Sequence, residues 1–363
     1  MAIDLKTLLK AMVDHKASDT HIRGGAPVFL RINGVVNQIN GSMMTPKEVE
    51  DMIFPLLNPR LKAIFEEKHD VDFSVDGDAS IGRFRFNVYL QKTKICVAIR
   101  HIPARIPSFE DLKLPVESIK KLLHNERGLI LVTGITGSGK TSTLAAMVEH
   151  LNNQWAGHII TIEDPIEFVF ENKKSIVSQR EIGTDTLTFV EALRGAMRQD
   201  PDVILVGEMR DLETTQAAIT AAETGHLVLG TMHTVNAVQT ISRIVDLFPP
   251  HQQAQVRIQL SEALKGIVSQ RLLPCTNGGR IPAVEVLAGT AHIRKMIAEN
   301  NTEAVNQAIA KGEFYGMQSF NQSLVRIHKQ GLAKLDDIIQ AASNPDDVLL
   351  AIKGIEQEIE LKK

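Results

Sequence analysis

Eight consecutive residues, 134–141, constrain the fold of this chain more than any other stretch. They read Gly-Ile-Thr-Gly-Ser-Gly-Lys-Thr and match G-x-x-x-x-G-K-[ST], the pattern of a phosphate-binding P-loop. An apolar run at 128–133 precedes them, and a helix-like stretch begins at Thr141. Glycines at these positions let backbone N–H groups turn toward an anion at the N-terminus of the helix. We therefore predict a buried strand, a phosphate-binding loop and a helix in this order.

The residue types of this loop predict a site for ATP with Mg²⁺. Lys140 is expected to reach the β- and γ-phosphates, and the Thr141 hydroxyl is expected to ligate Mg²⁺. The structural alternative is a glycine-rich turn without a ligand, which the strand and helix on either side disfavour. The expected binding residues are Gly134, Ile135, Thr136, Gly137, Ser138, Gly139, Lys140, Thr141 and Ser142.

Three further apolar runs follow the loop, at residues 158–162, 203–206 and 226–230. Helix-length segments separate them. Uniformly apolar strands of this kind are typical of a parallel sheet that helices cover on both faces. The sequence thus predicts an α/β core over 117–289, followed by a helical region over 290–363.

The first hundred residues have a different pattern, and we expect a small α+β domain over 1–102. Thr45, Pro46 and Glu48 have the pattern of a helix start. Three prolines then break the periodicity and predict a linker over 103–116. The expected strands of this domain are 28–32, 35–36, 83–90 and 95–102.

Two of the apolar runs of the core are followed by acidic residues. Glu163 and Asp164 come before Pro165, and Glu208 follows Gly207, in the place of a Walker B strand whose terminal Asp is missing. Ligands of open α/β sheets bind at the carboxyl ends of the strands. An acid at a strand end is ordinarily a solvated turn or a helix cap, but two such ends beside a P-loop favour catalysis. We expect Glu163 to polarise the attacking water and Glu208 to hold Mg²⁺ through water.

Two histidines, His226 and His233, lie at the two ends of the last apolar run. A lone histidine on a strand is usually a structural residue. Because this strand could lie beside the phosphate strand, sensing of the γ-phosphate is the functional alternative, and spacing alone does not separate the two.

The composition excludes several classes of protein. Lys and Arg total 40 against 43 Asp and Glu, a net charge of −3, so binding to nucleic acid through phosphate neutralisation is not expected. The two cysteines, Cys96 and Cys275, cannot form a disulfide scaffold or a thiolate metal site. The sequence has neither a run of roughly 20 apolar residues nor a secretion signal at Met1. We expect a soluble protein of a reducing compartment.

These motifs together resemble one family, the secretion-superfamily traffic ATPases, and within it the type IV pilus (PilT-like) retraction ATPases. Four signatures of that family occur in order: Walker A, an Asp box, a degenerate Walker B and a His box. Two further blocks, A-S-D-T-H-I and L-R-G-A-M-R-Q-D-P-D, resemble the family's pattern. In this chain the six blocks are residues 134–141, 161–168, 202–208, 224–234, 17–22 and 193–202.

The resemblance implies a RecA-like P-loop core, preceded by a small α+β (PAS-like) domain and followed by a helical C-terminal segment. It implies a homohexameric motor in the cytoplasm that hydrolyses ATP to power pilus retraction and twitching motility. The partner implied is an inner-membrane platform protein of the pilus machine, with membrane association only through partners and no direct contact with nucleic acid.

The resemblance also assigns arginines to the site. Arg85 and Arg100 match the pair that the N-terminal domain offers to the ATP of the neighbouring subunit, and Arg194 and Arg198 match a second pair in the core. From the residues alone, the alternation of Arg83 and Arg85 with apolar residues would favour the solvated face of a sheet.

Some features expected of the family help to assign the chain to one of its subclasses. Pilus-assembly and secretion ATPases carry a four-cysteine module and an extra N-terminal domain. We expect this chain to have neither, which favours a retraction ATPase. Residues 291–299 depart from the family's A-I-R-N-L-I-R-E block, so an accessory retraction paralogue stays open. Gly207 leaves open a nucleotide switch that hydrolyses poorly. A RecA-like nucleic-acid motor is disfavoured because aromatic residues make up 4% of the chain and Trp155 is its only tryptophan.

Overall fold

A computed structural model describes residues 4–32, 34–39, 43–77, 81–102 and 105–360. The chain divides into two compact units. Unit 1 is Met1–Ile106 with the short segment Glu167–Val169, and unit 2 is Pro107–Ile166 with Phe170–Lys363. Each unit is described by itself. The first two residues of the expected linker, 103 and 104, lie outside the described residues.

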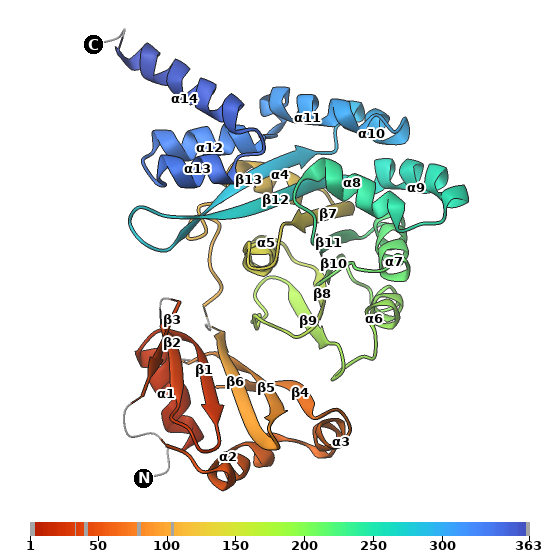
Figure 1. Cartoon of the computed structure of the whole chain (residues 1–363). Coiled ribbons are helices and arrows are strands. Elements are labelled where there is room, and N and C mark those ends of the chain that lie inside the picture. The colour runs from red at the N-terminus through yellow and green to blue at the C-terminus, as the bar shows by residue number, and fades with distance from the viewer. Residues whose placement is uncertain (1–3, 33, 40–42, 78–80, 103–104, 361–363) are drawn as a thin grey trace. The chain divides into compact units, whose positions relative to one another are not determined.

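Unit 1 is built on a six-stranded antiparallel sheet in the order β3-β2-β1-β6-β5-β4 (Figure 1). Its strands are β1 (Ala17–Arg23), β2 (Phe29–Ile32), β3 (Val35–Gln38), β4 (Asp70–Asp76), β5 (Arg83–Gln91) and β6 (Lys94–Ile102). Its helical elements are α1 (Leu5–Asp14), α2 (Pro46–Ile53), the 3-10 turn η1 (Phe54–Leu56) and α3 (Pro59–Lys68).

The elements of unit 1 follow from local sequence signals. Helix α2 begins where expected, because the Thr45 hydroxyl accepts the Glu48 N–H at 3.2 Å and the Glu48 carboxylate accepts the Thr45 N–H at 2.7 Å. Phe84 and Phe86 alternate along β5 and are fully buried. Strands β1 and β4 were not expected, since polar residues occupy their solvated positions and leave few apolar ones to show the alternation.

Unit 2 contains a seven-stranded sheet in the order β13-β12-β7-β11-β10-β8-β9 (Figure 1). Neighbouring strands are parallel except for β13, which pairs with β12 in the antiparallel sense. The expectation of a mainly parallel α/β core is confirmed. The strands are β7 (Gly128–Thr133), β8 (His158–Glu163), β9 (Ile176–Glu181), β10 (Val203–Val206), β11 (Leu227–Met232), β12 (Leu264–Pro274) and β13 (Arg280–Ala288).

Helices cover this sheet and form the end of the chain. Those of the core are α4 (Val116–Leu123), α5 (Lys140–Gln154), α6 (Phe189–Ala196), α7 (Leu212–Glu223), α8 (Ala237–Asp246) and α9 (Pro250–Ala263). The C-terminal ones are α10 (Ala291–Ala298), α11 (Thr302–Lys311), the 3-10 turn η2 (Glu313–Tyr315), α12 (Phe320–Lys329), α13 (Leu335–Ala341) and α14 (Pro345–Glu360). The helical C-terminal segment is thus confirmed.

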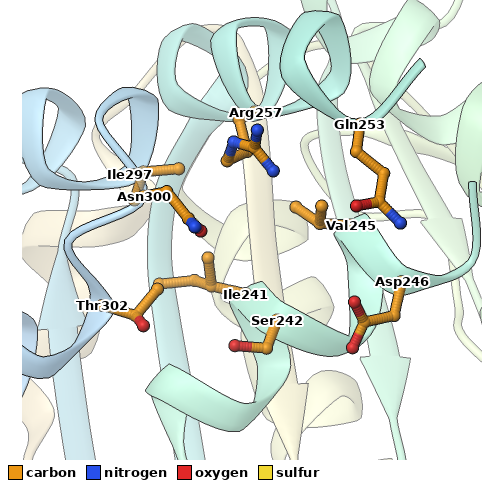
Figure 2. Close-up of a pocket in the computed structure, with 9 residues that line it drawn as sticks. All are labelled: Ile241, Ser242, Val245, Asp246, Gln253, Arg257, Ile297, Asn300 and Thr302. Atoms are coloured by element: carbon orange, nitrogen blue, oxygen red, sulfur yellow. The ribbon is translucent and has the colours of Figure 1, made fainter. Parts of the chain in front are cut away.

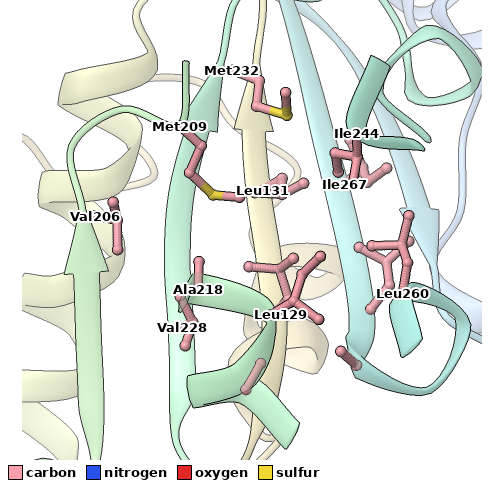
Figure 3. Packing of buried hydrophobic residues seen from close by; sticks show 14 of the residues in the cluster. Leu129, Leu131, Val206, Met209, Ala218, Val228, Met232, Ile244, Leu260 and Ile267 are labelled. Atoms are coloured by element: carbon pink, nitrogen blue, oxygen red, sulfur yellow. The ribbon is translucent and has the colours of Figure 1, made fainter. Parts of the chain in front are cut away.

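Strand β7 lies in the middle of the core, and all six of its residues are buried. Leu129 and Leu131 point to one face, where they pack with Val228, Met209 and Ile267 (Figure 3). Because side chains alternate along a strand, Ile130 and Val132 face the other side. Burial on both faces holds the strand that carries the phosphate loop in place.

The second half of the expected linker packs on unit 2. Phe109 and Leu114 are buried, and the Phe109 ring lies 5.4 Å from the imidazole of His150. Helix α4 begins directly afterward, at Val116. This part of the expected linker therefore belongs to the fold of unit 2.

Among the residues that the structure describes, no helix has both the length and the apolar character needed to cross a membrane.

The core packing predicts a matched pair of stability changes. Leu131→Ala should lower the free energy of unfolding of unit 2 by about 2–5 kcal/mol, because it leaves a cavity among fully buried side chains. Ile258→Ala, at a position that is 58% exposed, should change it by less than about 0.5 kcal/mol. Urea unfolding followed by the fluorescence of Trp155 measures both, and equal midpoints would contradict the packing.

Candidate functional site

The phosphate loop joins the end of β7 to the start of α5 through three glycines in the left-handed region of φ. Gly134, Gly137 and Gly139 have φ values of +148°, +79° and +94°. A Cβ atom on Gly134 would lie 2.5 Å from the carbonyl oxygen of Gln270 and from the Ser138 hydroxyl. Only glycine fits this position, because any side chain there would clash with Gln270 and with Ser138 of the same loop.

Lys140 is buried at the start of α5. Its ammonium donates to the carbonyl oxygens of Gly134 at 2.8 Å and Ile135 at 3.1 Å. Burial lowers the pKa of Lys140, and the nearby Glu208 carboxylate opposes that shift. A phosphate near the ammonium would favour its charged form.

Four parallel strands bring the candidate residues to one edge of the sheet. Thr133 pairs with Met232, and Val206 pairs with both Gly230 and Ile162. The residues that follow these strand ends therefore lie along the same edge. They are the phosphate loop, Glu163, Glu208 and His233, so the structure brings together four of the predicted groups.

Glu163 is the last residue of β8 and is 8% exposed. Its Oε1 accepts from the Thr161 hydroxyl at 2.7 Å and from the Gln179 amide at 3.2 Å. Two donors on one oxygen fix the plane of the carboxylate. Neither donor was anticipated, although Thr161 stands two residues before Glu163 and so on the same face of the strand.

Glu208 lies in the segment after β10, where His233 Nε2 is 2.8 Å from its Oε1. The guanidinium Nε of Arg210 contacts the same oxygen, and this hydrogen bond raises the pKa of Arg210. Arg210 was missed from the sequence; its place two residues after Glu208 was the available signal. Its side chain is 75% exposed, so it can reach beyond this site.

His226 lies at the opposite end of β11 from His233, which corrects the functional alternative that both histidines sense the γ-phosphate within one unit. Its backbone carbonyl accepts the N–H of Gly128, at the start of β7, and its Nδ1 lies 2.9 Å from the Ala221 carbonyl oxygen. The strand between the two histidines spans roughly 20 Å. The geometry excludes His226 from the phosphate site of its own unit and favours a structural role.

Arg194 and Arg198 are not brought to the phosphate loop either. Arg194 is exposed on α6, and Arg198 donates to its carbonyl oxygen at 3.0 Å from just beyond the end of that helix. The chain then enters β10 at its amino end, the edge away from the loop. In this unit both guanidinium groups face solvent.

Arg85 and Arg100 are directly opposite each other on β5 and β6 of unit 1. Like charges in this position repel, and two carboxylates offset the repulsion. Asp19 accepts from Arg100 Nε at 2.8 Å, and Asp72 lies 3.6 Å from Arg85 Nε. The alternation of side chains along the sheet places both arginines on its more exposed face. This position agrees with the solvated sheet face expected from the residues alone and also leaves the arginines accessible, as the family resemblance requires.

The loop passes a chemical test for a phosphate ligand. The Ser138 hydroxyl is buried and has no hydrogen-bond partner among the described residues. It lies in a loop with three left-handed glycines and a buried lysine, a combination that binds anions. The donors present therefore fit the phosphates of a nucleotide.

A separate cavity lies between α8, α9 and the junction of α10 and α11 (Figure 2). Its volume is about 130 Å³, below the range of roughly 300–1,000 Å³ typical of small-molecule sites. The side chains around it include Arg257, Asp246 and Asn300. It contains none of the groups at the phosphate edge.

Comparison with known proteins shows similarity along nearly the whole chain. The family described as "Type II/IV secretion system protein" matches residues 2–340. The chain is 44% identical over 345 residues to the type IV pilus retraction ATPase PilT of Pseudomonas aeruginosa, which covers 95% of this chain and 100% of that one. It is 38% identical over 352 residues to the type IV pilus ATPase PilU of the same organism, covering 97% and 92%.

A crystal structure of the pilus retraction motor PilT with bound ADP has the same fold. It superimposes with a TM-score of 0.89 and 46% sequence identity, over 95% of this chain and 98% of that one.

The geometry predicts different effects for Lys140→Ala and Glu163→Gln. Lys140→Ala removes the charge that faces the phosphates and should weaken nucleotide binding and turnover together. Glu163→Gln keeps the shape but loses the basic oxygen, so ATP should bind while turnover falls roughly 10²-fold or more. Phosphate release and binding of a fluorescent ATP analogue measure the two effects.

Glu149→Gln is the control for this pair, since Glu149 lies on α5 in an ion pair with Lys173. It should hydrolyse ATP at the wild-type rate. Wild-type turnover by the Glu163→Gln protein would transfer the role of base to Glu208.

Proposed function

Since this chain belongs to the family of type II/IV secretion system proteins, we propose that it is a motor that hydrolyses ATP to retract type IV pili and so supports twitching motility. The observation that carries the proposal is one sheet edge that joins a complete phosphate loop to Glu163, Glu208 and His233. The match to a retraction ATPase extends over 95% of the chain and all of that relative.

The chain's own residues divide the chemistry among them. Mg²⁺ bound with ATP supplies positive charge to the β- and γ-phosphates. The loop N–H groups and Lys140 bind the phosphates, and the Thr141 hydroxyl and Glu208, through water, hold the metal. Glu163 accepts a proton from the attacking water, in an orientation that Thr161 and Gln179 fix.

His233 and Arg210 complete the site from the side of Glu208. Both lie within ion-pair distance of Glu208 Oε1, a buried oxygen that has no hydrogen-bond partner of good geometry among the described residues. A γ-phosphate near Glu208 would repel the carboxylate and attract the cationic groups beside it. His233 is therefore the residue of the His box that responds to the γ-phosphate.

Arg85 and Arg100 support a composite active site in a homohexamer. They point out of unit 1 and are held by single carboxylates, and the Arg100 side chain is 64% exposed. Such pairs cost little to break, so phosphates of a neighbouring subunit can take over the guanidinium groups. Arg194 and Arg198, exposed on the core, form the second pair at this boundary.

The proposed localisation of the motor is the cytoplasmic face of the inner membrane. There the ring would act on a platform protein of the pilus machine, without binding nucleic acid. The similarity to pilus ATPases over 95–97% of the chain supports this assignment.

A second candidate is an accessory retraction ATPase. The departure of residues 291–299 from the retraction block favours it, and the higher identity to PilT than to PilU favours the principal motor. Restoration of twitching in a strain that lacks its own retraction ATPase separates the two, because an accessory protein would not restore it alone.

Mixed rings test the composite site. Arg100→Ala chains and Glu163→Gln chains should each be inactive alone. Mixing them creates boundaries where an intact arginine faces an intact core, so partial ATP hydrolysis should return. Mixing Arg85→Ala with Arg100→Ala chains is the control and should restore nothing, because every donor then lacks one arginine. No recovery in rings shown to be mixed would argue against arginines supplied in trans.

Nucleotide state should change the distance between the units. Contacts of Arg85 and Arg100 with the γ-phosphate exist only with ATP, and a ligand shifts a conformational equilibrium only by its difference in affinity for the two states. Spin labels at exposed Lys62 and Ile258 should report different distances with an ATP analogue and with ADP. Identical distances in all states would favour the nucleotide switch over the motor.

A further inference from the structure

One buried carboxylate of unit 2 has no part in the mechanism above. Glu285 lies in β13 and is 6% exposed. Burial raises the pKa of its carboxyl, while the Ala237 N–H, the Arg271 guanidinium and the Ser269 hydroxyl act against that rise. A polar group at this depth destabilises the fold unless its partners are fixed. Two of these neighbours, Ala237 at the start of α8 and Ser269 on β12, indicate which segments Glu285 positions.

The first partner is the N-terminus of α8. The N–H of Ala237, the first residue of that helix, donates to Glu285 Oε1 at 2.8 Å. The first N–H groups of a helix have no partner within it, and a negative charge is stabilised there. Asn236 caps the same turn by accepting the Gln239 N–H at 2.8 Å. Acceptors from two elements thus fix where α8 begins.

The start of α8 sets the position of His233, three residues before Asn236. The intervening segment is tied to the helix, because the Thr234 and Thr240 hydroxyls lie 2.6 Å apart and Val235 N–H donates to Gln239 at 2.8 Å. A displacement of the first turn of α8 would therefore move His233, whose Nε2 lies 2.8 Å from Glu208.

The second partner leads to the phosphate loop. Ser269 on β12 is the cross-strand neighbour of Glu285, and its hydroxyl lowers the pKa of the Glu285 carboxyl. The Ser269 hydroxyl accepts from the Thr133 hydroxyl at 3.0 Å, and this bond is buried. Thr133 is the last residue of β7, directly before Gly134. One carboxylate is thus connected to both segments that form the phosphate edge.

We propose that Glu285 is a positioning residue for ATP hydrolysis, which fixes His233, and through it Glu208, relative to the phosphate loop. The inference rests on the proposed ATPase function. Glu285 touches no reacting atom; it holds the first turn of α8, and with it His233, while Ser269 and Thr133 link it to the strand that carries the phosphate loop. The acceptor oxygen is the essential feature, because the first N–H of α8 donates to it.

The test compares Glu285→Ala, Glu285→Gln and the control Ser323→Ala. The control removes the 3.0 Å hydrogen bond from the Val284 N–H to the Ser323 hydroxyl, which is also buried. Val284 is next to Glu285 in the chain, but this bond does not connect to α8 or to the phosphate loop. In Glu285→Ala, kcat for ATP should fall roughly tenfold or more while KM stays within about twofold. Glu285→Gln keeps an acceptor oxygen and should retain kcat within about threefold, and Ser323→Ala should match the wild type.

A second variant shows whether the effect passes through His233. If it does, His233→Ala combined with Glu285→Ala should be no slower than His233→Ala alone. Additive losses, or wild-type kcat in Glu285→Ala, would overturn the inference.

Amide hydrogen exchange of the nucleotide-free protein tests the positioning role of Glu285 independently of ATP hydrolysis. Peptides that span residues 233–241 should exchange roughly tenfold faster in Glu285→Ala than in the wild type, Glu285→Gln or Ser323→Ala. Unchanged exchange there would refute the positioning role whether or not the protein hydrolyses ATP. A wild-type protein that releases no phosphate would refute the proposed function alone.

Discussion

The parallel register of β7 with its neighbours is the constraint on which the rest of unit 2 depends. Thr133 lies opposite Met232, so the phosphate loop and His233 leave the sheet at the same level. The register of β10 with β8 and β11 adds Glu163 and Glu208 to that edge. Strand β7 is buried on both faces, and a slip by one residue would exchange its two apolar faces. The packing energy of the core therefore also fixes the geometry of the site.

Charge is distributed differently in the two units. At the phosphate edge, Lys140 is buried against loop carbonyls, and Glu208 is held by His233 and Arg210. These groups are arranged before a ligand binds, which reduces the reorganisation that the reaction requires. In unit 1, Arg85 and Arg100 lie on β-strands rather than in a phosphate loop, and each forms an ion pair with one carboxylate. Exposed ion pairs of this kind contribute little to stability and cost little to break.

The sequence predicted those helices and strands that are marked by apolar periodicity and by residues that end them, such as glycine and proline. Strands β7 and β10 begin and end at the expected residues, because uniformly buried strands contain no polar interruption. The strand pair β12–β13 was not anticipated, since Ser269, Gln270 and Glu285 interrupt its apolar pattern and become intelligible only through partners distant in sequence. Strand direction explains the failure of the expectation for His226: two histidines that bracket a parallel strand lie at opposite edges of the sheet.

The polar interior of β12 and β13 follows from where these strands lie. Gln270, beside Ser269, faces the other side of the sheet and donates to the Thr143 hydroxyl of α5 at 2.9 Å, while its carbonyl oxygen approaches Gly134. Arg271 donates to the Ala341 carbonyl oxygen at 2.7 Å and covers the Phe320 ring at 3.9 Å. Three consecutive residues of β12 thus contact the phosphate strand, the phosphate helix and the C-terminal helices. A purely apolar strand would bury as much surface but would lack the directional bond from Arg271 to the Ala341 carbonyl oxygen. Because hydrogen bonds depend on angle and distance, these three contacts fix the position of β12 more narrowly than apolar packing alone would. The same strand therefore positions the phosphate helix on one side and the C-terminal helices on the other.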